Sequence, residues 1–199
     1  MKTILLATGN QNKAREIKNL LDNVFEVVTM KDYGIAIDII EDGLTYEENA
    51  LIKVRALKPY VLGKDIILMG DDSGLSVDYL NGAPGIYSAR YAGEDVDYAA
   101  NNKKLLAVMK DVPAEKRGAA FICVIAILFP DGRELTFRGE VRGTIAFDYT
   151  GTGGFGYDPI FIHQDTGRAY AQMSDNEKNR LSHRAAAIAK AKPLLLNNK

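Results

Sequence analysis

The chain has 199 residues, of which 47% are hydrophobic and 26% charged, and its formal net charge is −1. This length allows one domain with a sizeable core, and the composition is typical of a soluble globular protein, so we expect a single domain over residues 1–199. A charge near zero gives no overall attraction for nucleic acid or an anionic membrane, so a polyanionic ligand has to be held by local charges.

Cysteine content and apolar runs indicate the compartment. Cys123 is the only cysteine, which excludes an intrachain disulfide and favours a buried, unreactive thiol in a reducing compartment. The four-residue apolar run at residues 4–7 is too short for a signal peptide. The longest run, residues 119–129, is shorter than the roughly 20 residues that cross a bilayer. We therefore expect a cytoplasmic protein.

The N-terminal segment predicts a strand, a glycine-containing loop and a helix. Residues 4–7 are apolar, residues 8–13 form the loop, and apolar residues then recur at helical spacing. A helix start attracts anions through its free amides and the helix dipole. Lys13 opposes that dipole, which a bound phosphate would explain. The alternative is a plain turn with an asparagine cap.

An acidic pair follows the apolar residues 66–69. We expect the strand to end there, so that Asp71 and Asp72 lie at the carboxyl end of a buried strand, where ligands bind in open α/β sheets. Adjacent carboxylates attract a cation, and Mg²⁺ is the usual one beside substrate phosphates. The alternative is that the pair starts a turn before Gly74.

A second acidic segment precedes a predicted helix. Thr45 and Glu48 match a capping box, which gives Glu48 a structural task. Glu41 lies just outside the helix and has no such task. Glu41 is therefore the better candidate for a second metal ligand, although Glu48 and Asp71 remain open.

The other elements follow from periodicity and capping signals. An antiparallel hairpin joined to βα units predicts a mixed sheet. The elements are a strand at residues 24–30, a helix at 97–109, a hairpin with arms at 119–129 and 135–142, a strand at 160–162, a short helix capped by Ser174 and Glu177, and a final helix at 183–192 ending at Pro193.

A glycine-rich loop and a cluster of cations complete the candidate site. Residues 151–159 contain four glycines around Phe155 and Tyr157, whose rings could stack on a base. A flexible surface loop is the alternative. Lys178, His183 and Arg184 lie near predicted helix starts, where cations are unfavourable without a ligand. A lone histidine such as His183 is more often structural than catalytic.

Six motifs resemble the inosine triphosphate pyrophosphatase family, also called Ham1-like. They follow the family's order along nearly the whole chain, and together they are specific although each alone is weak. They are Thr8-Gly9-Asn10 with Lys13, Thr-Tyr-Glu-Glu-Asn-Ala at residues 45–50, Asp-Asp-Ser-Gly-Leu at 71–75, the segment 82–91, the segment 151–161, and Ser182-His183-Arg184.

The resemblance implies an α/β fold with a mixed, elongated, curved central sheet flanked by helices, in two lobes with an active-site cleft between them. It implies hydrolysis of ITP, dITP and XTP to the monophosphate and pyrophosphate, which removes deaminated purines from the nucleotide pool. It also implies Mg²⁺, with one or more ions per subunit, and a homodimer. Neither nucleic acid nor a membrane is an expected partner.

The resemblance also assigns roles by motif. Ile40 departs from the pattern, since many relatives have an acidic residue there. Asp72 and Lys13 would be catalytic, because Asp72 can orient or deprotonate the attacking water and Lys13 can neutralise charge on the phosphates. The triphosphate would be bound by Thr8, Gly9, Asn10, Gln11, Asn12 and Lys13, and the metal by Glu41 and Asp72. The base with its keto group would be contacted by Phe155, Gly156, Tyr157, Asp158, Lys178, His183 and Arg184. Ser73 is a further substrate-binding candidate.

Two rival functions remain. Maf-type pyrophosphatases carry a serine-proline-arginine signature after the first strand, where this chain has residues 10–13 as Asn-Gln-Asn-Lys. A nucleotide-sensing or RNA-binding module would have little need for several carboxylates beside a phosphate loop.

Selectivity for deaminated purines would come from hydrogen-bond donors aimed at the 6-keto oxygen of the base.

Overall fold

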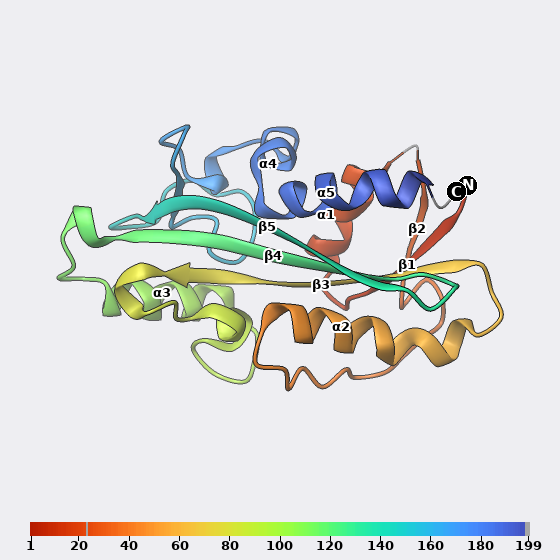
Figure 1. The fold of residues 1–199 in the computed structure, drawn as a ribbon. Helices are drawn as coiled ribbons and strands as arrows, with labels where there is room; N and C mark the ends of the chain where they lie inside the picture. The colour runs from red at the N-terminus through yellow and green to blue at the C-terminus, as the bar shows by residue number, and fades with distance from the viewer. Residues whose placement is uncertain (23, 198–199) are drawn as a thin grey trace. The chain divides into compact units, whose positions relative to one another are not determined.

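The computed structural model describes residues 1–22 and 24–197. Its strands form one six-stranded sheet in the order β2-β1-β3-β4-β5-β6 (Figure 1). The elements are β1 (Thr3–Ala7), α1 (Gln11–Leu21), β2 (Glu26–Thr29), α2 (Tyr46–Leu57), β3 (Ile66–Val77), α3 (Tyr98–Val108), β4 (Gly118–Leu128), β5 (Glu134–Ile145), β6 (Phe161–His163), α4 (Asp175–Leu181) and α5 (His183–Asn197). Short 3-10 helices lie at Lys58–Val61, Asp78–Leu80, Gly85–Arg90, Ala114–Lys116 and Tyr170–Gln172.

The sheet is mixed, as predicted. Strand β1 pairs in parallel with β2 and with β3, whereas β5 and β6 are antiparallel. The predicted α/β fold, with helices flanking a mixed sheet, is thereby confirmed. None of the helices that the structure describes is long and apolar enough to cross a membrane.

The chain divides into two compact units. Unit 1 comprises residues 1–72, 123–139 and 184–199, and unit 2 comprises residues 73–122 and 140–183. The single domain with two lobes and a cleft stays a prediction. Each unit has its own apolar cluster.

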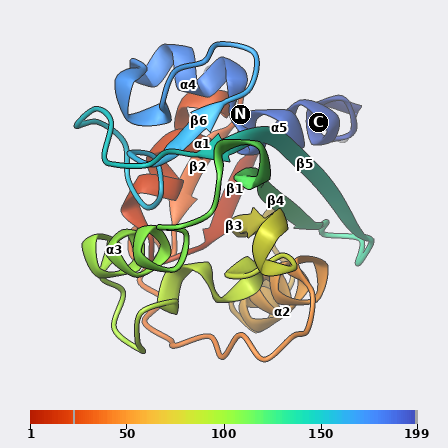
Figure 2. The ribbon, with the colours of Figure 1, turned by 90° about the vertical axis from the view of Figure 1, so that its left-hand side faces the viewer.

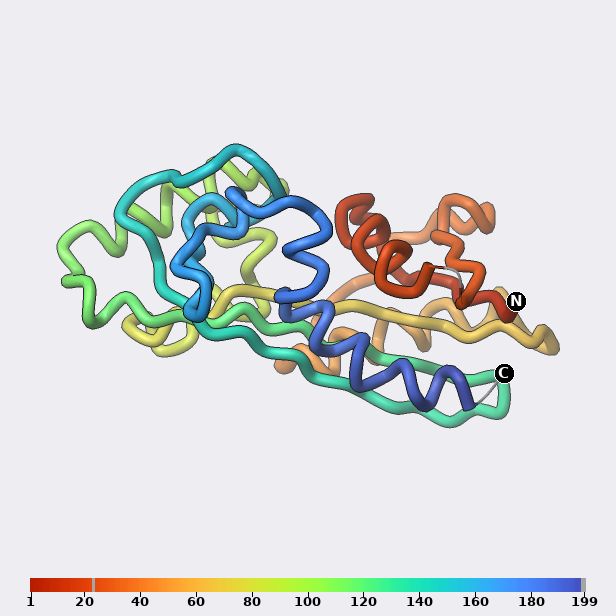
Figure 3. The backbone as a smooth tube through the Cα atoms, turned by 90° about the horizontal axis from the view of Figure 1, so that it is seen from above, coloured from red at the N-terminus to blue at the C-terminus, as the bar shows by residue number. Residues whose placement is uncertain are grey.

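In unit 1, alternate residues of three strands face two helices. Ile4 of β1, Ile67 of β3 and Ile125 of β4 share a buried cluster with side chains of α1 and α5. Figure 3 shows α5 running beside the β4–β5 hairpin, where Lys190 Nζ donates to the Arg138 carbonyl at 2.6 Å. Helix α2 covers the opposite face of these strands (Figure 1).

In unit 2, α3 and α4 lie on different sides of the strand segments (Figure 2). Apolar residues of β3, β4 and α3 share a second buried cluster with Tyr157 and Phe161. The capping box predicted before α4 is confirmed, because Ser174 accepts from the Glu177 amide while Glu177 accepts from Ser174.

The prediction that a strand ends at Asp71 is wrong, because β3 continues through both aspartates to Val77. The reason is burial, since Leu75 and Val77 are fully buried in the second apolar cluster. It is β1 that ends here, with Ala7 paired to Gly70. The aspartates therefore lie beside the carboxyl end of the neighbouring strand.

The last helix does not end at Pro193 as predicted, because α5 runs to Asn197 with Pro193 inside it. Proline removes one helical hydrogen bond. Leu195 of the following turn is fully buried in the unit 1 cluster, and this packing favours a continued helix.

Candidate active site

The loop between β1 and α1 is ordered by its own polar side chains. Asn10 caps α1, as its Oδ1 accepts from the amides of Asn12 at 3.0 Å and Lys13 at 3.2 Å. Thr8 Oγ1 accepts from the Asn10 amide at 3.1 Å. The asparagine cap considered from the sequence is thus present. At Gly9 an added Cβ would have no neighbour within 4 Å, so the loop faces open space there.

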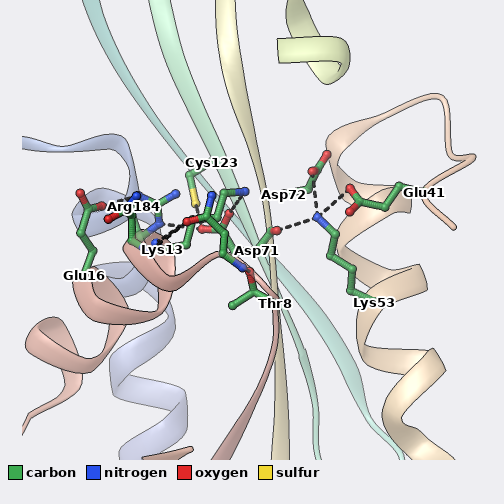
Figure 4. Close-up of polar contacts among 11 residues, drawn as sticks. Thr8, Lys13, Glu16, Glu41, Lys53, Asp71, Asp72, Cys123 and Arg184 are labelled. Atoms are coloured by element: carbon green, nitrogen blue, oxygen red, sulfur yellow. Dashed lines mark hydrogen bonds and ion pairs between the residues drawn. The ribbon is translucent and has the colours of Figure 1, made fainter. Parts of the chain in front are cut away.

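A buried network of charges joins α1 to β3 (Figure 4). Lys13 Nζ lies 2.7 Å from Asp71 Oδ1, and Arg184 Nε donates to Asp71 Oδ2 at 2.7 Å. The guanidinium of Arg184 also pairs with Glu16 of α1. Each of these four side chains is at most 16% exposed. The opposing charges therefore neutralise one another inside unit 1.

Ionisation in the network follows from these pairs. Burial alone would raise the pKa of Asp71, but Arg184 and Lys13 hold it well below its usual value. Burial lowers the pKa of Lys13, yet the Asp71 carboxylate produces a net increase. Cys123 donates to Asp71 Oδ2 at 3.3 Å, and burial raises the pKa of this thiol well above its usual value. The prediction of a buried, unreactive thiol agrees with this environment.

Asp72 points to a different cation. Lys53 Nζ of α2 lies 3.1 Å from Asp72 Oδ1 and 2.7 Å from Glu41 Oε2, and it donates to the Asp71 carbonyl at 2.9 Å (Figure 4). The other oxygen of Asp72, Oδ2, is buried and has no hydrogen-bond partner. Burial raises the pKa of Asp72, and the Glu41 carboxylate acts in the same direction, whereas Lys53 opposes them.

Two glycines allow the close packing that brings Lys53 to the acidic residues. A Cβ at Gly70 would lie 2.6 Å from the Ala50 carbonyl, so α2 can approach β3 only because this residue is glycine. The Gly43 amide donates to Asn49 Oδ1 at 2.9 Å, which fastens the segment behind Glu41 to α2. Asn49 and Lys53 lie one helical turn apart and are both buried.

Glu41 and Asp72 have the chemistry of a Mg²⁺ site. Two carboxylates from separate segments meet at one cation, and Asp72 Oδ2 offers an unused buried oxygen. Asp71 is paired with Lys13 and Glu48 accepts from the Leu44 amide at 2.6 Å, and a role for either as a further ligand stays a prediction. Across residues 1–22 and 24–197, no group of three or more histidine, cysteine or acidic side chains could hold a metal. Further oxygens would have to come from water or substrate phosphates, as is usual for Mg²⁺.

In unit 2, the glycine-rich loop is fastened by Asp158. Asp158 Oδ2 accepts from the Phe155 amide at 2.8 Å and from Lys178 Nζ at 2.6 Å. A Cβ at Gly154 would lie 2.1 Å from the same oxygen, so only glycine fits. Lys178 Nζ also lies 4.6 Å from the centre of the Phe155 ring, a cation–π distance. The structure thus brings together the predicted residues Phe155, Asp158 and Lys178.

Other hydrogen bonds hold the neighbouring loop residues. Tyr157 donates its hydroxyl to the Ser88 carbonyl at 2.9 Å, and Asn102 of α3 donates to the Gly156 carbonyl at 2.9 Å. Gly156 has a φ of 63°, and an added Cβ there would meet nothing within 4 Å. The ring of His183 stacks on Phe121, with centroids 4.6 Å apart.

The predicted residues therefore form two groups. Those from Thr8 to Lys13 belong to unit 1 with Glu41, Asp72 and Arg184, whereas Ser73 and the base-binding candidates belong to unit 2. Their contacts with substrate stay predictions. The sequence reasoning did not find Glu16, Asn49, Lys53 or Asn102. Polar residues at helical spacing on the apolar face of a helix, such as Asn49 and Lys53, are the signal that could have found them.

Comparisons with known proteins identify the family. A model described as the Ham1 family matches residues 4–194. A dITP/XTP pyrophosphatase of Clostridium perfringens (strain 13 / Type A) is 45% identical over 196 residues, covering 96% of both chains. The dITP/XTP pyrophosphatase of Bacillus subtilis (strain 168) is 42% identical, covering 98% of both. The solved structure of the Staphylococcus aureus Ham1 protein matches with a TM-score of 0.86 and 39% identity over 100% of each chain. The chain therefore belongs to the Ham1 family.

Proposed function

We propose that the chain is a pyrophosphatase that hydrolyses dITP, XTP and ITP to the nucleoside monophosphate and pyrophosphate, and so removes deaminated purines from the nucleotide pool. Near full-length similarity to two dITP/XTP pyrophosphatases supports the reaction. The observation that carries it is Asp72, a buried carboxylate with a raised pKa and one unused oxygen beside the end of β1.

Asp72 and Lys13 would supply the chemistry. Water has to attack the α-phosphorus while pyrophosphate leaves, and negative charge develops on the phosphate oxygens. A carboxylate with a raised pKa is a better base at neutral pH, so Asp72 can orient the water and accept its proton. Lys13, at the start of α1, would stabilise the phosphate charge. Mg²⁺, held by Glu41 and Asp72, would supply further charge neutralisation when bound.

The loop in unit 2 would recognise the base. The Phe155 ring offers a stacking surface, while Lys178 and His183 can donate to a 6-keto oxygen. Arg184 is also a predicted donor to the keto oxygen. In the structure its guanidinium pairs with Asp71 and Glu16, and its contact with substrate stays a prediction. An adenine amino group would leave such donors unsatisfied, so adenine nucleotides should be poor substrates.

A cytoplasmic location and a homodimer form part of the same proposal. The family resemblance supports the dimer, and the single buried cysteine is consistent with a reducing compartment. Size-exclusion chromatography with light scattering would measure the assembly directly. A monomer at all concentrations would reject the homodimer and leave the proposed reaction intact.

A substrate panel tests the reaction. Pyrophosphate release would be measured from dITP, XTP, ITP and dATP, each with Mg²⁺ and with excess chelator. We expect rapid release from the first three nucleotides with Mg²⁺, a rate at least about a hundredfold lower on dATP, and none without metal. Equal rates on dITP and dATP would refute the selectivity, and no release from any deaminated nucleotide would refute the function.

A further inference from the structure

We propose that Lys53 is the resident counter-ion of the two metal carboxylates, and that its ammonium group leaves them when a divalent cation binds. The inference rests on the proposed function, since it takes Glu41 and Asp72 as the metal ligands. It concerns Lys53, a side chain of the chain itself that lies between these two carboxylates.

The geometry places one ammonium between two acids. Lys53 Nζ lies 2.7 Å from Glu41 Oε2 and 3.1 Å from Asp72 Oδ1, with side chains of Lys53 and Asp72 that are 8% and 7% exposed. A third bond, to the Asp71 carbonyl at 2.9 Å, completes the three donors of the ammonium group. Lys53 is therefore held by the same two carboxylates that would bind the metal.

Without this lysine, the buried carboxylate of Asp72 and the carboxylate of Glu41, which is 34% exposed, would face each other with no cation between them. Two nearby carboxylates repel each other when no cation lies between them, and a buried charge that loses its partner is strongly destabilising. Helix α2 is fixed by the close contact at Gly70 and by the Asn49 bond to Gly43. These contacts place the backbone of Lys53 next to the two carboxylates.

The same arrangement opposes metal binding. A divalent cation bound by Glu41 and Asp72 would repel the Lys53 ammonium from these carboxylates, because like charges a few ångströms apart repel each other strongly in such a site. The flexible four-carbon stem of lysine allows the ammonium to move while the helix stays in place. Removing the ammonium should therefore strengthen metal binding, although it weakens the metal-free fold.

Calorimetric titration with Mg²⁺ alone, in the absence of nucleotide, tests the exchange. Lys53→Met removes the charge and keeps most of the stem, and Lys58→Met is the matched control at an exposed position just after α2. We expect Lys53→Met to bind Mg²⁺ at least about tenfold more tightly than wild type, and Lys58→Met to be unchanged. Equal or weaker binding by Lys53→Met would overturn the inference.

Thermal unfolding provides a second readout. Lys53→Met should unfold at a lower temperature than wild type without metal, and saturating Mg²⁺ should reduce the difference. A difference that Mg²⁺ leaves unchanged would contradict the exchange.

If Lys53→Met does not fold, a measurement on the wild-type protein still tests the proposal. The ammonium signal of Lys53 in a ¹⁵N spectrum, assigned by its loss in Lys53→Arg, should shift when Mg²⁺ is added. An unchanged signal under saturating Mg²⁺ would overturn the proposal. The substrate panel is separate, because a wild type that hydrolyses dITP without this exchange would reject the inference alone.

Discussion

Lys13 Nζ lies 2.7 Å from Asp71 Oδ1, so a lysine in the first turn of α1 is paired with an aspartate in the middle of β3. A cation at that end of a helix opposes the helix dipole. Asp71 balances it within the chain and also accepts from Arg184 of α5. This pair links residues 8–13, the predicted phosphate-binding segment, to β3. It also explains the position of Lys13 without a bound anion.

Asp71→Asn should destabilise the protein strongly, because it leaves Lys13 and Arg184 buried with too little negative charge. Breaking one partner of a buried pair costs about 3–5 kcal/mol. Urea unfolding would measure the change. Glu134→Gln is the control, since Glu134 pairs with Arg55 at 2.6 Å near the surface, and such pairs contribute less than about 1 kcal/mol. Equal losses in the two variants would contradict the structural role of Asp71.

Asp72→Asn should abolish hydrolysis and leave the fold intact. The amide keeps the size of the side chain but cannot accept a proton from water, and loss of a general base lowers rates by about 10²–10⁴-fold. Pyrophosphate release from dITP with Mg²⁺ would measure turnover, and circular dichroism would show whether the variant is folded. Asp65→Asn, at an exposed position before β3, is the matched control and should keep wild-type turnover. Near-normal hydrolysis by Asp72→Asn would remove Asp72 from the mechanism.

Local signals predicted most of the elements. The caps at Asn10, Thr45 and Ser174 each precede a helix, because a side chain there accepts from amides of its own first turn. The signal for the hairpin of β4 and β5 is also local, because a turn between two apolar runs predicts it. These interactions connect residues close in sequence, so the sequence pattern contains them.

Tertiary packing determines the element ends and the ion pairs that local signals do not predict. The acidic pair predicted a strand end, but burial of Leu75 extended β3, and burial of Leu195 carried α5 past Pro193. The partner of Lys13 and the position of Lys53 depend on segments far apart in the chain. The sequence singles out Glu41 because it lacks a structural task, and Asp72 because it belongs to an acidic pair after an apolar run. That reasoning could not reveal that a lysine already lies between them.

Asn102→Ala should weaken substrate binding more than turnover. Asn102 lies on α3 and holds the Gly156 carbonyl at 2.9 Å, so its loss would free the loop that is proposed to bind the base. Because this bond positions a loop and touches no reacting atom, KM for dITP should rise at least about fivefold while kcat stays within about twofold. Lys103→Ala, at the next and exposed position of α3, is the control. A fall in kcat with an unchanged KM would contradict this role.

Glu177→Gln should lower stability at neutral pH, with a difference from wild type that disappears in acid. Glu177 accepts from the Ser174 amide and pairs with Arg168, and these contacts lower its pKa from 4.5 to about 2. A lowered pKa in the folded state gives stability that is present above the unfolded value and is lost as the pH falls toward about 2. Thermal unfolding between pH 7 and pH 2 would measure the difference, with Glu115→Gln as an exposed control in unit 2. A difference that stays constant over this range would show that the carboxylate charge is not what stabilises the start of α4.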